Sequence, residues 1–426
     1  MNYKEALAYL SQLGKFGMIL GMERIQGLLG ELDNPQNKIK TIHVTGTNGK
    51  GSVTAFLSSI LLSAKLRVGT FTSPHFVKYN ERITLNGEEI SDEEFAALAT
   101  AVAQAEEKMK AKGGQQPSQF EVLTAMGFLF FANKKVDYAV IEVGMGGLWD
   151  STNVIVPQVS IITNVTLEHT AVLGNTVAAI AEQKAGIVKP SVPVVTACQG
   201  EALDVVRAKA EECQAPLYVC GKDFTVQGSS FSARGQSFVY QFGEQQENFA
   251  MSLLGDHQLS NGAVALTAAK ILAAKEPALT AEAITVGMSS TLWPGRLEII
   301  RQEPIVLLDG AHNPSGVTVL RQALDKYFPT QKRFFIFGMM ADKDMQKVAS
   351  ILFRPTDKVL TVLADDSPRA ATAKTLEEII GSRAKAYDDV FAAYRAALDM
   401  AENNDLICLC GSLYLVGTFK TGQVTI

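Results

Sequence analysis

The chain has 426 residues, of which 47% are hydrophobic and 19% are charged, and its formal net charge is −5. This length predicts two or three domains, and the apolar content is sufficient for ordinary globular cores. The modest charge content argues against long disordered regions, and the slightly acidic balance gives no support for a nucleic-acid partner.

The sequence predicts neither a signal peptide nor a membrane-spanning segment. Residues 1–5 enter an amphipathic pattern without the apolar core of a signal peptide, and the most apolar window, 122–132, is too short to cross a bilayer. The five cysteines are an odd number, and Cys408 and Cys410 point to one face of a predicted buried strand. We expect a cytoplasmic protein with reduced thiols and no membrane segment. No long apolar seam stands out, which favours a monomer.

From residue 40 to about residue 292, short apolar strands alternate with helices, which predicts a mostly parallel α/β sheet. Asn86-Gly87 is a strong hairpin turn, and Ser91 is the expected N-cap of a long helix. The expected elements are strands at 42–44, 67–71, 136–143 and 159–162, helices at 50–64 and from 92, a hairpin at 82–90, and an antiparallel excursion at 224–253.

The run Leu292-Trp293-Pro294-Gly295 interrupts this alternation. It predicts a hinge at 293–297 between an N-terminal P-loop-type domain, 1–292, and a C-terminal domain, 298–426. In the C-terminal part βα alternation begins again, as in a smaller Rossmann-like α/β domain. The strand candidates there are 305–308, 334–337, 358–362 and 406–409.

The strongest local signal is a glycine-rich loop between a strand and a helix, preceded by His43-Val44-Thr45. Backbone N–H groups of such a loop surround phosphate oxygens, and Lys50 supplies a positive charge for the β- and γ-phosphates. Gly51 stands where a Ser or Thr hydroxyl usually holds magnesium, so metal ligands must partly come from elsewhere. The alternative is a turn without a ligand. The residues expected to contact ATP are Thr47, Asn48, Gly49, Lys50, Gly51 and Ser52.

Two more polar groups follow predicted strands. Glu142 ends one strand, and His169 lies in the segment after the next. The carboxyl ends of parallel strands meet at one edge of a sheet, where α/β proteins bind ligands, and magnesium prefers oxygen ligands. Taken singly, such a Glu is more often a cap or an ion-pair partner, and a lone His is usually structural, so both interpretations stay open.

Short motifs follow one another along most of the chain. They are 43–52, Thr72-Ser73-Pro74-His75, 81–83, 142–147, Asp150-Ser151-Thr152-Asn153, 182–187, 255–258, 294–296 and 309–314. Together they resemble the folylpolyglutamate synthase and dihydrofolate synthase family of the Mur ligase superfamily. The resemblance implies a magnesium-ATP ligase: a folate carboxylate attacks the γ-phosphate to give an acyl phosphate, and the amine of L-glutamate then displaces phosphate.

The resemblance also implies roles for individual residues. Ser73, Glu142 and His169 would be magnesium ligands, and a carbamylated Lys184 (N6-carboxylysine) would help to hold a second magnesium ion. ATP would be contacted from the domain seam by Asn261, Arg296 and Asp309. The catalytic and glutamate-handling residues would be Lys50, Lys184, Asp309, His312 and Ser412. The folate contacts would be Arg82, Gln119, Phe120, Asp150 and Ser151. The apolar stretch 16–25 would also help to form the folate pocket.

Two departures from the family pattern and three alternatives accompany this interpretation. Glu168 stands where relatives commonly have Asp, which lengthens a side chain next to the proposed ligand His169 by one methylene. Gln183 stands where Glu is frequent, and neither departure removes a required group. The enzyme could also act as a dihydrofolate synthase on dihydropteroate, or as another Mur-type ligase adding an amino acid to a cell-wall precursor. A regulatory P-loop ATPase without ligase chemistry would leave the second domain unexplained.

Overall fold

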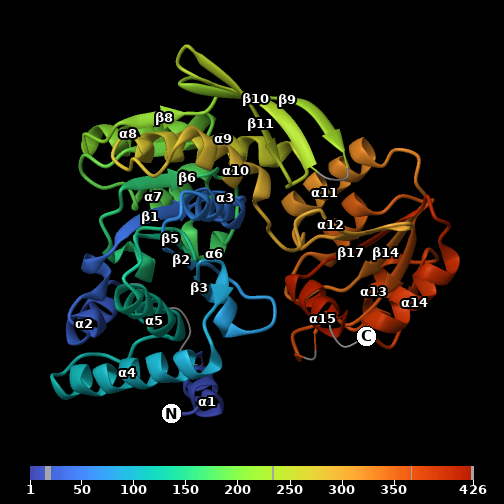
Figure 1. Cartoon of the computed structure of the whole chain (residues 1–426). Coiled ribbons are helices and arrows are strands. Elements are labelled where there is room, and N and C mark those ends of the chain that lie inside the picture. Colours follow the sequence, from blue (N-terminus) through green and yellow to red (C-terminus); the bar gives the residue numbers. More distant parts are fainter. Residues whose placement is uncertain (15–20, 233–234, 366, 424–426) are drawn as a thin grey trace. The chain divides into compact units, whose positions relative to one another are not determined.

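The computed structural model of the chain describes residues 1–14, 21–232, 235–365 and 367–423 (Figure 1). It divides into two compact units. The larger unit comprises Met1–Ser229, Ser237–Met251 and Gln258–Thr291, and the smaller unit comprises Ser230–Gln236, Ser252–His257 and Leu292–Ile426. The hinge and domain limits expected from the sequence stay predictions. Within the described ranges, no helix combines the length and apolar character needed to cross a membrane.

The larger unit is built on an eight-stranded sheet of order β4-β3-β2-β5-β1-β6-β7-β8. All neighbours from β2 to β8 in this order pair in parallel, and only the β2–β3 and β3–β4 pairs at one edge are antiparallel, so the predicted mostly parallel sheet is confirmed. The strands are β1 Lys40–Thr45, β2 Val68–Phe71, β3 Ile83–Leu85, β4 Glu88–Glu89, β5 Tyr138–Glu142, β6 Val159–Ile162, β7 Val194–Thr196 and β8 Leu217–Val219.

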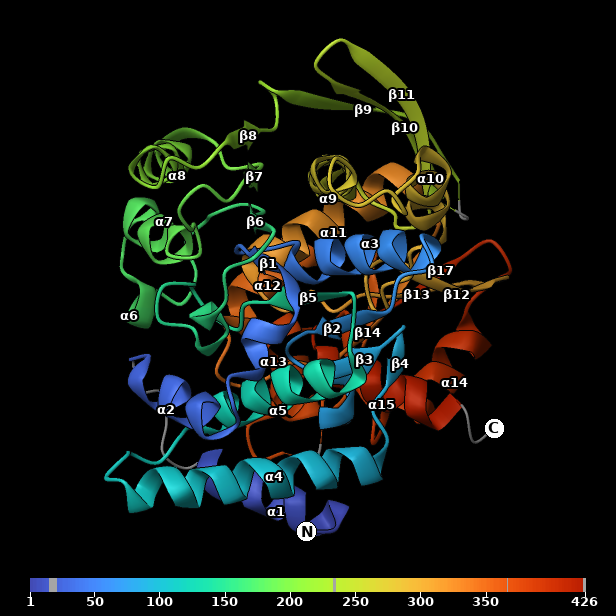
Figure 2. The same cartoon turned by 60° about the vertical axis from the view of Figure 1, so that its left-hand side comes forward.

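Helices cover both faces of this sheet (Figure 2). On one face lies α3 (Lys50–Ser63), where α10 (Ala281–Ser290) packs so closely that a Cβ at Gly287 would be 2.3 Å from the Ile60 Cα. On the other lies α5 (Gln119–Lys134), which shares a buried apolar cluster with α1, α2 and α4. The remaining helices are α1 Tyr3–Leu13, α2 Glu23–Glu31, α4 Asp92–Ala111, α6 Thr170–Leu173, α7 Val177–Ala185, α8 Gly200–Glu212 and α9 Asp256–Ala273, with 3-10 turns η2 Pro35–Lys38, η3 Tyr79–Arg82 and η4 Ser151–Val154.

Two local predictions for this unit are confirmed. Ser91 caps α4, because its hydroxyl accepts the Glu94 N–H while the Glu94 carboxylate accepts the Ser91 N–H. The excursion after β8 is a separate three-stranded sheet of order β11-β10-β9. Its strands are β9 Phe224–Ser232, β10 Gly235–Phe242 and β11 Gln245–Met251.

The smaller unit has a six-stranded sheet of order β12-β13-β17-β14-β15-β16, parallel except for β12. The four predicted strands are present, and β12 and β16 extend the sheet at its two edges. The strands are β12 Glu298–Gln302, β13 Ile305–Leu308, β14 Arg333–Phe337, β15 Lys358–Thr361, β16 Ala384–Ala386 and β17 Leu406–Cys410. The helices are α11 Pro314–Tyr327, α12 Met345–Leu352, α13 Ala373–Ile380, α14 Val390–Met400 and α15 Leu413–Gln423.

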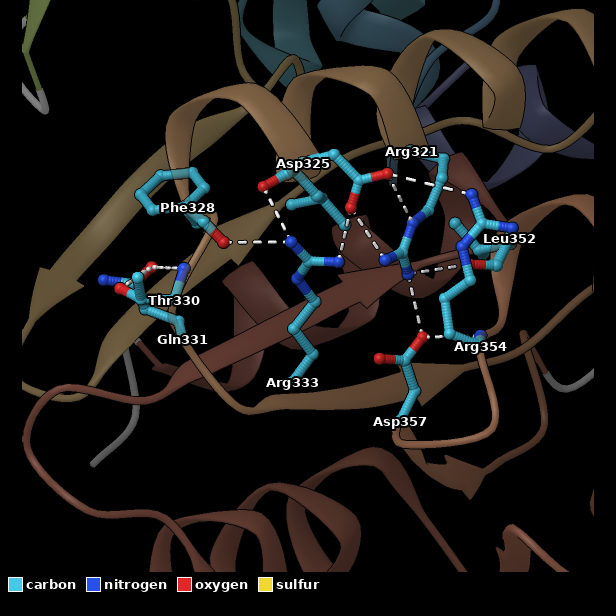
Figure 3. A network of polar contacts seen from close by, with 10 residues as sticks. Arg321, Asp325, Phe328, Thr330, Gln331, Arg333, Leu352, Arg354 and Asp357 are labelled. Atoms are coloured by element: carbon cyan, nitrogen blue, oxygen red, sulfur yellow. Dashed lines mark hydrogen bonds and ion pairs between the residues drawn. The ribbon is translucent and has the colours of Figure 1, made fainter.

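A network of arginines and aspartates closes one end of this sheet (Figure 3). Asp325, near the end of α11, accepts hydrogen bonds from Arg321 at 2.8 Å and from Arg333 at 2.7 Å. Arg321 also donates to Asp357 at 2.8 Å, and Arg333 also donates to the Leu324 carbonyl at 3.0 Å. The arginines therefore satisfy helix-end carbonyls, the buried carboxylate of Asp357 and the exposed carboxylate of Asp325 together.

The network makes stability depend on pH. Burial alone would raise the pKa of Asp325, but the hydrogen bonds and charges of Arg321 and Arg333 outweigh it, so the pKa is lowered. A carboxyl with a depressed folded pKa contributes stability above its unfolded pKa, about 4, and loses that contribution as the pH falls through the folded pKa. We expect denaturant unfolding to show Asp325→Asn less stable than wild type at pH 7, with the difference shrinking toward pH 3. A difference that does not change with pH would contradict this.

Candidate active site

The ends of four parallel strands bring the candidate residues to one edge of the larger sheet. In the order β2-β5-β1-β6, the strands run into Ser73, Glu142, the glycine-rich loop and Asn164. Parallel register fixes this alignment, since Val44 of β1 lies opposite Glu142 of β5 and Ile161 of β6. The sheet edge predicted to bind ligands thus carries the candidate phosphate and metal residues.

The glycine-rich loop opens α3 with its N–H groups unused by a side-chain cap. Gly49 is the N-cap, at φ 85°, and no side chain caps it. The ammonium of Lys50 donates to the carbonyls of Gly46 at 2.8 Å and Thr47 at 3.2 Å, which holds it over the loop. Free N–H groups at a helix N-terminus and a nearby ammonium are features that favour anion binding.

The segment after β6 braces this loop. Thr47 N–H donates to the Asn164 carbonyl at 2.8 Å, and Asn48 N–H donates to the Asn164 side chain at 3.0 Å. Thr163 donates its hydroxyl to the Asn48 carbonyl at 2.6 Å. A Cβ at Gly46, whose φ is 150°, would lie 1.8 Å from the Thr163 hydroxyl, so only glycine fits there. The loop is therefore held in shape before any ligand arrives.

Helix α9 supports the loop from a second side. The fully buried Gln258 donates to the Ser52 hydroxyl at 3.1 Å and accepts from Asn261 at 2.9 Å. Asn261, predicted to contact ATP, lies against the loop, since a Cβ at Gly49 would be 2.3 Å from its Oδ1. The structure thus brings Asn261 and Ser52 together through Gln258, to which the sequence motif gave no role.

Lys184 is buried near the same loop. It lies in the last turn of α7, is 1% exposed, and forms an ion pair with Glu168 at 2.7 Å. Burial, together with the charge of Lys50, lowers the pKa of Lys184 to about 8. Burial would raise the pKa of Glu168, but the charges of Lys184 and Lys50 outweigh it and the pKa is lowered. Lys184 therefore offers more neutral amine near neutral pH than an exposed lysine does.

The candidate magnesium ligands are oxygen-rich. The Glu142 carboxylate, 3% exposed, accepts the Ser73 N–H at 3.2 Å, so these two residues are adjacent. His169 precedes α6 in a left-handed conformation, at φ 46°. Among the described residues, no three His, Cys, Asp or Glu side chains converge on one point. A carboxylate beside a serine residue fits magnesium, which keeps several waters and takes few protein ligands.

Three of the candidate folate residues meet around the turn after β5. Asp150 is buried, and its carboxylate accepts the Met145 N–H at 2.9 Å and the Thr152 N–H at 3.0 Å. Burial raises its pKa, against these hydrogen bonds. Ser151 is 2.7 Å from the Thr124 hydroxyl, and Phe120 lies so close to the turn that a Cβ at Gly144 would be 2.5 Å from its ring. Asp150 and Ser151 therefore belong to one compact turn, against which Phe120 of α5 packs.

The other two folate candidates meet at Tyr79. Gln119 donates to the Tyr79 hydroxyl at 3.0 Å, and the Arg82 guanidinium lies 5.6 Å from the Tyr79 ring centre. Arg82 also donates to His75 Nδ1 at 2.9 Å, and burial, with Arg82, lowers the pKa of His75 to about 4. The sequence interpretation gave Tyr79 no role. The neighbouring apolar stretch 16–25 lies outside the described residues over 16–20.

In the smaller unit, the remaining candidates gather at the ends of β13 and β17. Asp309 is buried and accepts the N–H groups of Leu297 at 3.0 Å and Ala311 at 2.9 Å. Burial raises its pKa, opposed by Arg296, and the same burial lowers the pKa of His312. Ser412, directly after the Gly411 turn, accepts the Tyr414 N–H at 3.2 Å. Gly411 N–H bonds to the Ala311 carbonyl at 3.1 Å, which links the two strand ends.

The fold and this site define an ATP-dependent ligase of the Mur type, and comparisons with known proteins agree. The Mur ligase middle domain matches residues 44–269, and the Mur ligase glutamate ligase domain matches residues 295–413. The chain is 36% identical to the dihydrofolate synthase/folylpolyglutamate synthase of Bacillus subtilis over 98% of both chains. It is 38% identical to the folylpolyglutamate synthase of Lacticaseibacillus casei over 99% of this chain and 98% of that protein.

A solved structure agrees with the sequence relatives. The Mycobacterium tuberculosis folylpolyglutamate synthase complexed with ADP superimposes with a TM-score of 0.88 at 29% identity, covering 99% of this chain and 98% of that one. The chain belongs to the folylpolyglutamate synthase and dihydrofolate synthase family of Mur ligases. The resemblance stated from the sequence motifs is confirmed.

Proposed function

We propose that the chain is an ATP-dependent ligase that adds L-glutamate to the γ-carboxyl of a folate, with tetrahydrofolate as the reference substrate. The acceptor carboxylate attacks the γ-phosphorus of ATP, ADP leaves, and an acyl phosphate forms. The glutamate amine then attacks the acyl carbon, phosphate leaves from the tetrahedral intermediate, and an amide results. The observation that carries this proposal is the braced loop with Lys50, at the sheet edge that also bears Glu142 and near the buried Lys184. The chain that carries it belongs to this family.

The reaction must overcome electrostatic repulsion between its reactants. A carboxylate and a triphosphate repel each other, so preorganised positive charge near both lowers the barrier. Lys50 supplies such a charge at the loop. In the smaller unit, Arg296 and Asp309 are proposed to handle ATP, and His312 and Ser412 to handle glutamate. Gln119, Phe120, Arg82, Asp150 and Ser151 are proposed to bind the folate.

Magnesium is the proposed metal, with Ser73, Glu142 and His169 as its ligands and a carbamate on Lys184 toward a second ion. The bound metal would neutralise phosphate charge. The donor chemistry supports this assignment, since Gly51 of the loop has no hydroxyl and the adjacent Ser73 and Glu142 supply oxygens. The burial of Lys184 supports carbamate formation, because carbon dioxide reacts with a neutral amine. We also propose a cytoplasmic monomer.

Replacing the proposed carboxylate ligand tests the metal assignment. Glu142→Gln keeps an acceptor for the Ser73 N–H but removes the charge. We expect the magnesium concentration for half-maximal activity to rise by about tenfold or more. Glu106→Gln is a matched control, because Glu106 of α4 is also buried but is bonded to Tyr9 of α1 and to Lys110 of α4. Equal magnesium dependence in both variants would rule out Glu142 as a ligand.

The decisive assay offers purified protein magnesium-ATP and labelled L-glutamate, with tetrahydrofolate and dihydropteroate in parallel. Glutamate incorporation into tetrahydrofolate supports the proposed activity. Incorporation into dihydropteroate as well supports a second activity, dihydrofolate synthesis, which the name of the B. subtilis relative favours. ATP hydrolysis that is independent of glutamate and of the acceptor would overturn both and favour an ATPase.

A further inference from the structure

We propose that His43 is a positioning residue for the folate: through Thr152 it fixes the Asp150-Ser151 turn to β1, the strand that carries the phosphate loop. The inference rests on the proposed function, since it takes Asp150 and Ser151 as folate contacts. It adds one residue to the machinery, placed inside a strand and away from any substrate. His43 would act only through the turn that it holds.

In the link between β1 and the turn, His43 donates to Thr152 and Thr152 donates to Asp150. The Thr152 hydroxyl donates to Asp150 Oδ1 at 2.6 Å, and the same oxygen accepts the Thr152 N–H at 3.0 Å. Because that hydroxyl hydrogen is committed to Asp150, the 2.8 Å contact between His43 Nε2 and Thr152 Oγ1 requires the proton on Nε2. His43 and Thr152 are both completely buried. The imidazole therefore donates to the hydroxyl that orients the Asp150 carboxylate.

The other nitrogen of this ring argues against a purely structural role. His43 Nδ1 is buried and has no hydrogen-bond partner among the described residues. An unsatisfied buried acceptor lowers stability, so an apolar side chain of similar size would serve packing better. Burial also lowers the pKa of His43 to about 3, which keeps the ring neutral. What the histidine supplies is its Nε2 donor to Thr152.

The same face of β1 makes a second hydrogen bond to this turn and also provides a control position. Side chains alternate along a strand, so Thr41, His43 and Thr45 share one face. Thr45 donates its hydroxyl to the Gly146 carbonyl at 2.6 Å, at the start of the same turn. The Thr41 hydroxyl is buried without a hydrogen-bond partner among the described residues. Two of the three positions therefore hold the turn, and the third does not.

The consequence is that one strand sets the positions of both reactants. β1 ends in the loop proposed to hold the triphosphate, and its polar face holds the turn proposed to hold the folate. Loosening the turn should therefore harm the folate side while leaving the loop, which is braced separately by Asn164 and Gln258, in place.

The test compares His43→Leu, which removes the donor, with His43→Gln, whose amide can reach the position of Nε2, and with Thr41→Val as the control. In steady-state kinetics we expect His43→Leu to raise KM for tetrahydrofolate about tenfold, the effect of one lost buried hydrogen bond, and to leave KM for ATP within about twofold. His43→Gln should recover most of the loss. Thr41→Val should match wild type.

Equal changes in both KM values, an unchanged KM for tetrahydrofolate, or a His43→Gln variant no better than His43→Leu would overturn the proposal. Thr152→Val removes the acceptor for His43 and also the hydroxyl bond to Asp150. It keeps the proposal testable if His43→Leu does not fold, because it should raise KM for tetrahydrofolate at least as much. Where both fold, the double variant should be no worse than Thr152→Val alone. A wild-type protein without glutamate ligation would instead refute the proposed function.

Discussion

Replacing Lys50 by methionine is expected to lower kcat for glutamate ligation by about 10²-fold or more, because a preorganised charge partner of the developing phosphate charge is lost. The variant should fold normally, since the hydrogen bonds of the Lys50 ammonium within the described part of the chain go to the Gly46 and Thr47 carbonyls of its own loop. Steady-state turnover with saturating magnesium-ATP, acceptor and glutamate measures the effect, with thermal unfolding as the check on folding.

A matched control lies at the other end of the same helix. Lys65 follows α3, is exposed, and can be replaced by methionine with the same loss of charge. Lys65→Met should keep wild-type turnover. If Lys50→Met lost less than about fivefold, or if both variants lost equally, the loop would not be the site of charge stabilisation that we assign to it.

Replacing Lys184 by arginine is expected to have a comparable effect, a loss of about 10²-fold or more in kcat. Arginine keeps a positive charge that can pair with Glu168, but it stays protonated and so cannot take up carbon dioxide as a carbamate. The role proposed for Lys184 needs an anionic oxygen at this position. A simple ion-pair role would be largely preserved in Lys184→Arg, which separates the two interpretations.

The second readout for Lys184 is independent of activity. In ¹³C-bicarbonate, wild-type protein should show a carbamate carbon resonance that is absent from Lys184→Arg. Lys189→Arg is the control, because Lys189 is also partly buried and donates to the Asn153 carbonyl. A wild-type spectrum without the resonance, or full activity in Lys184→Arg, would refute the carbamate.

Much of the fold could be predicted because the signals for its elements lie within short stretches of the sequence. The apolar strands at 42–44 and 159–162, the Asn86-Gly87 turn and the Ser91 cap each depend on neighbours within a few residues. Among the strands that the sequence did not predict, β16, Ala384–Ala386, is short. Another, β12, Glu298–Gln302, contains charged residues and is partly exposed. They exist because they pair with β15 and β13, which is information from elsewhere in the chain.

The site divides in the same way. The loop residues from Thr47 to Ser52 follow from the strand, glycine and helix pattern. Glu142 and His169 were indicated by their positions after predicted strands, whereas the ligand role of Ser73 came only from family resemblance, and all three ligand roles remain predictions. Gln258 contacts Ser52 from 206 positions away in the sequence, and Thr152 contacts His43 from 109 positions away. No periodicity or turn signal encodes such pairs. They are set by how helices and loops pack on the sheet.

The close packing of Gly186 against Leu148 restricts how this enzyme could acquire new substrates. A Cβ at Gly186 would lie 2.4 Å from the Leu148 Cα, and the Leu148 N–H donates to the Gln183 carbonyl at 2.7 Å. The helix end bearing Lys184 and the turn leading to Asp150 therefore move as one piece. Mutational drift that reshapes the turn for a different acceptor will disturb Lys184 as well. Changes of acceptor preference should instead accumulate at Gln119 and Tyr79, which meet through their side chains.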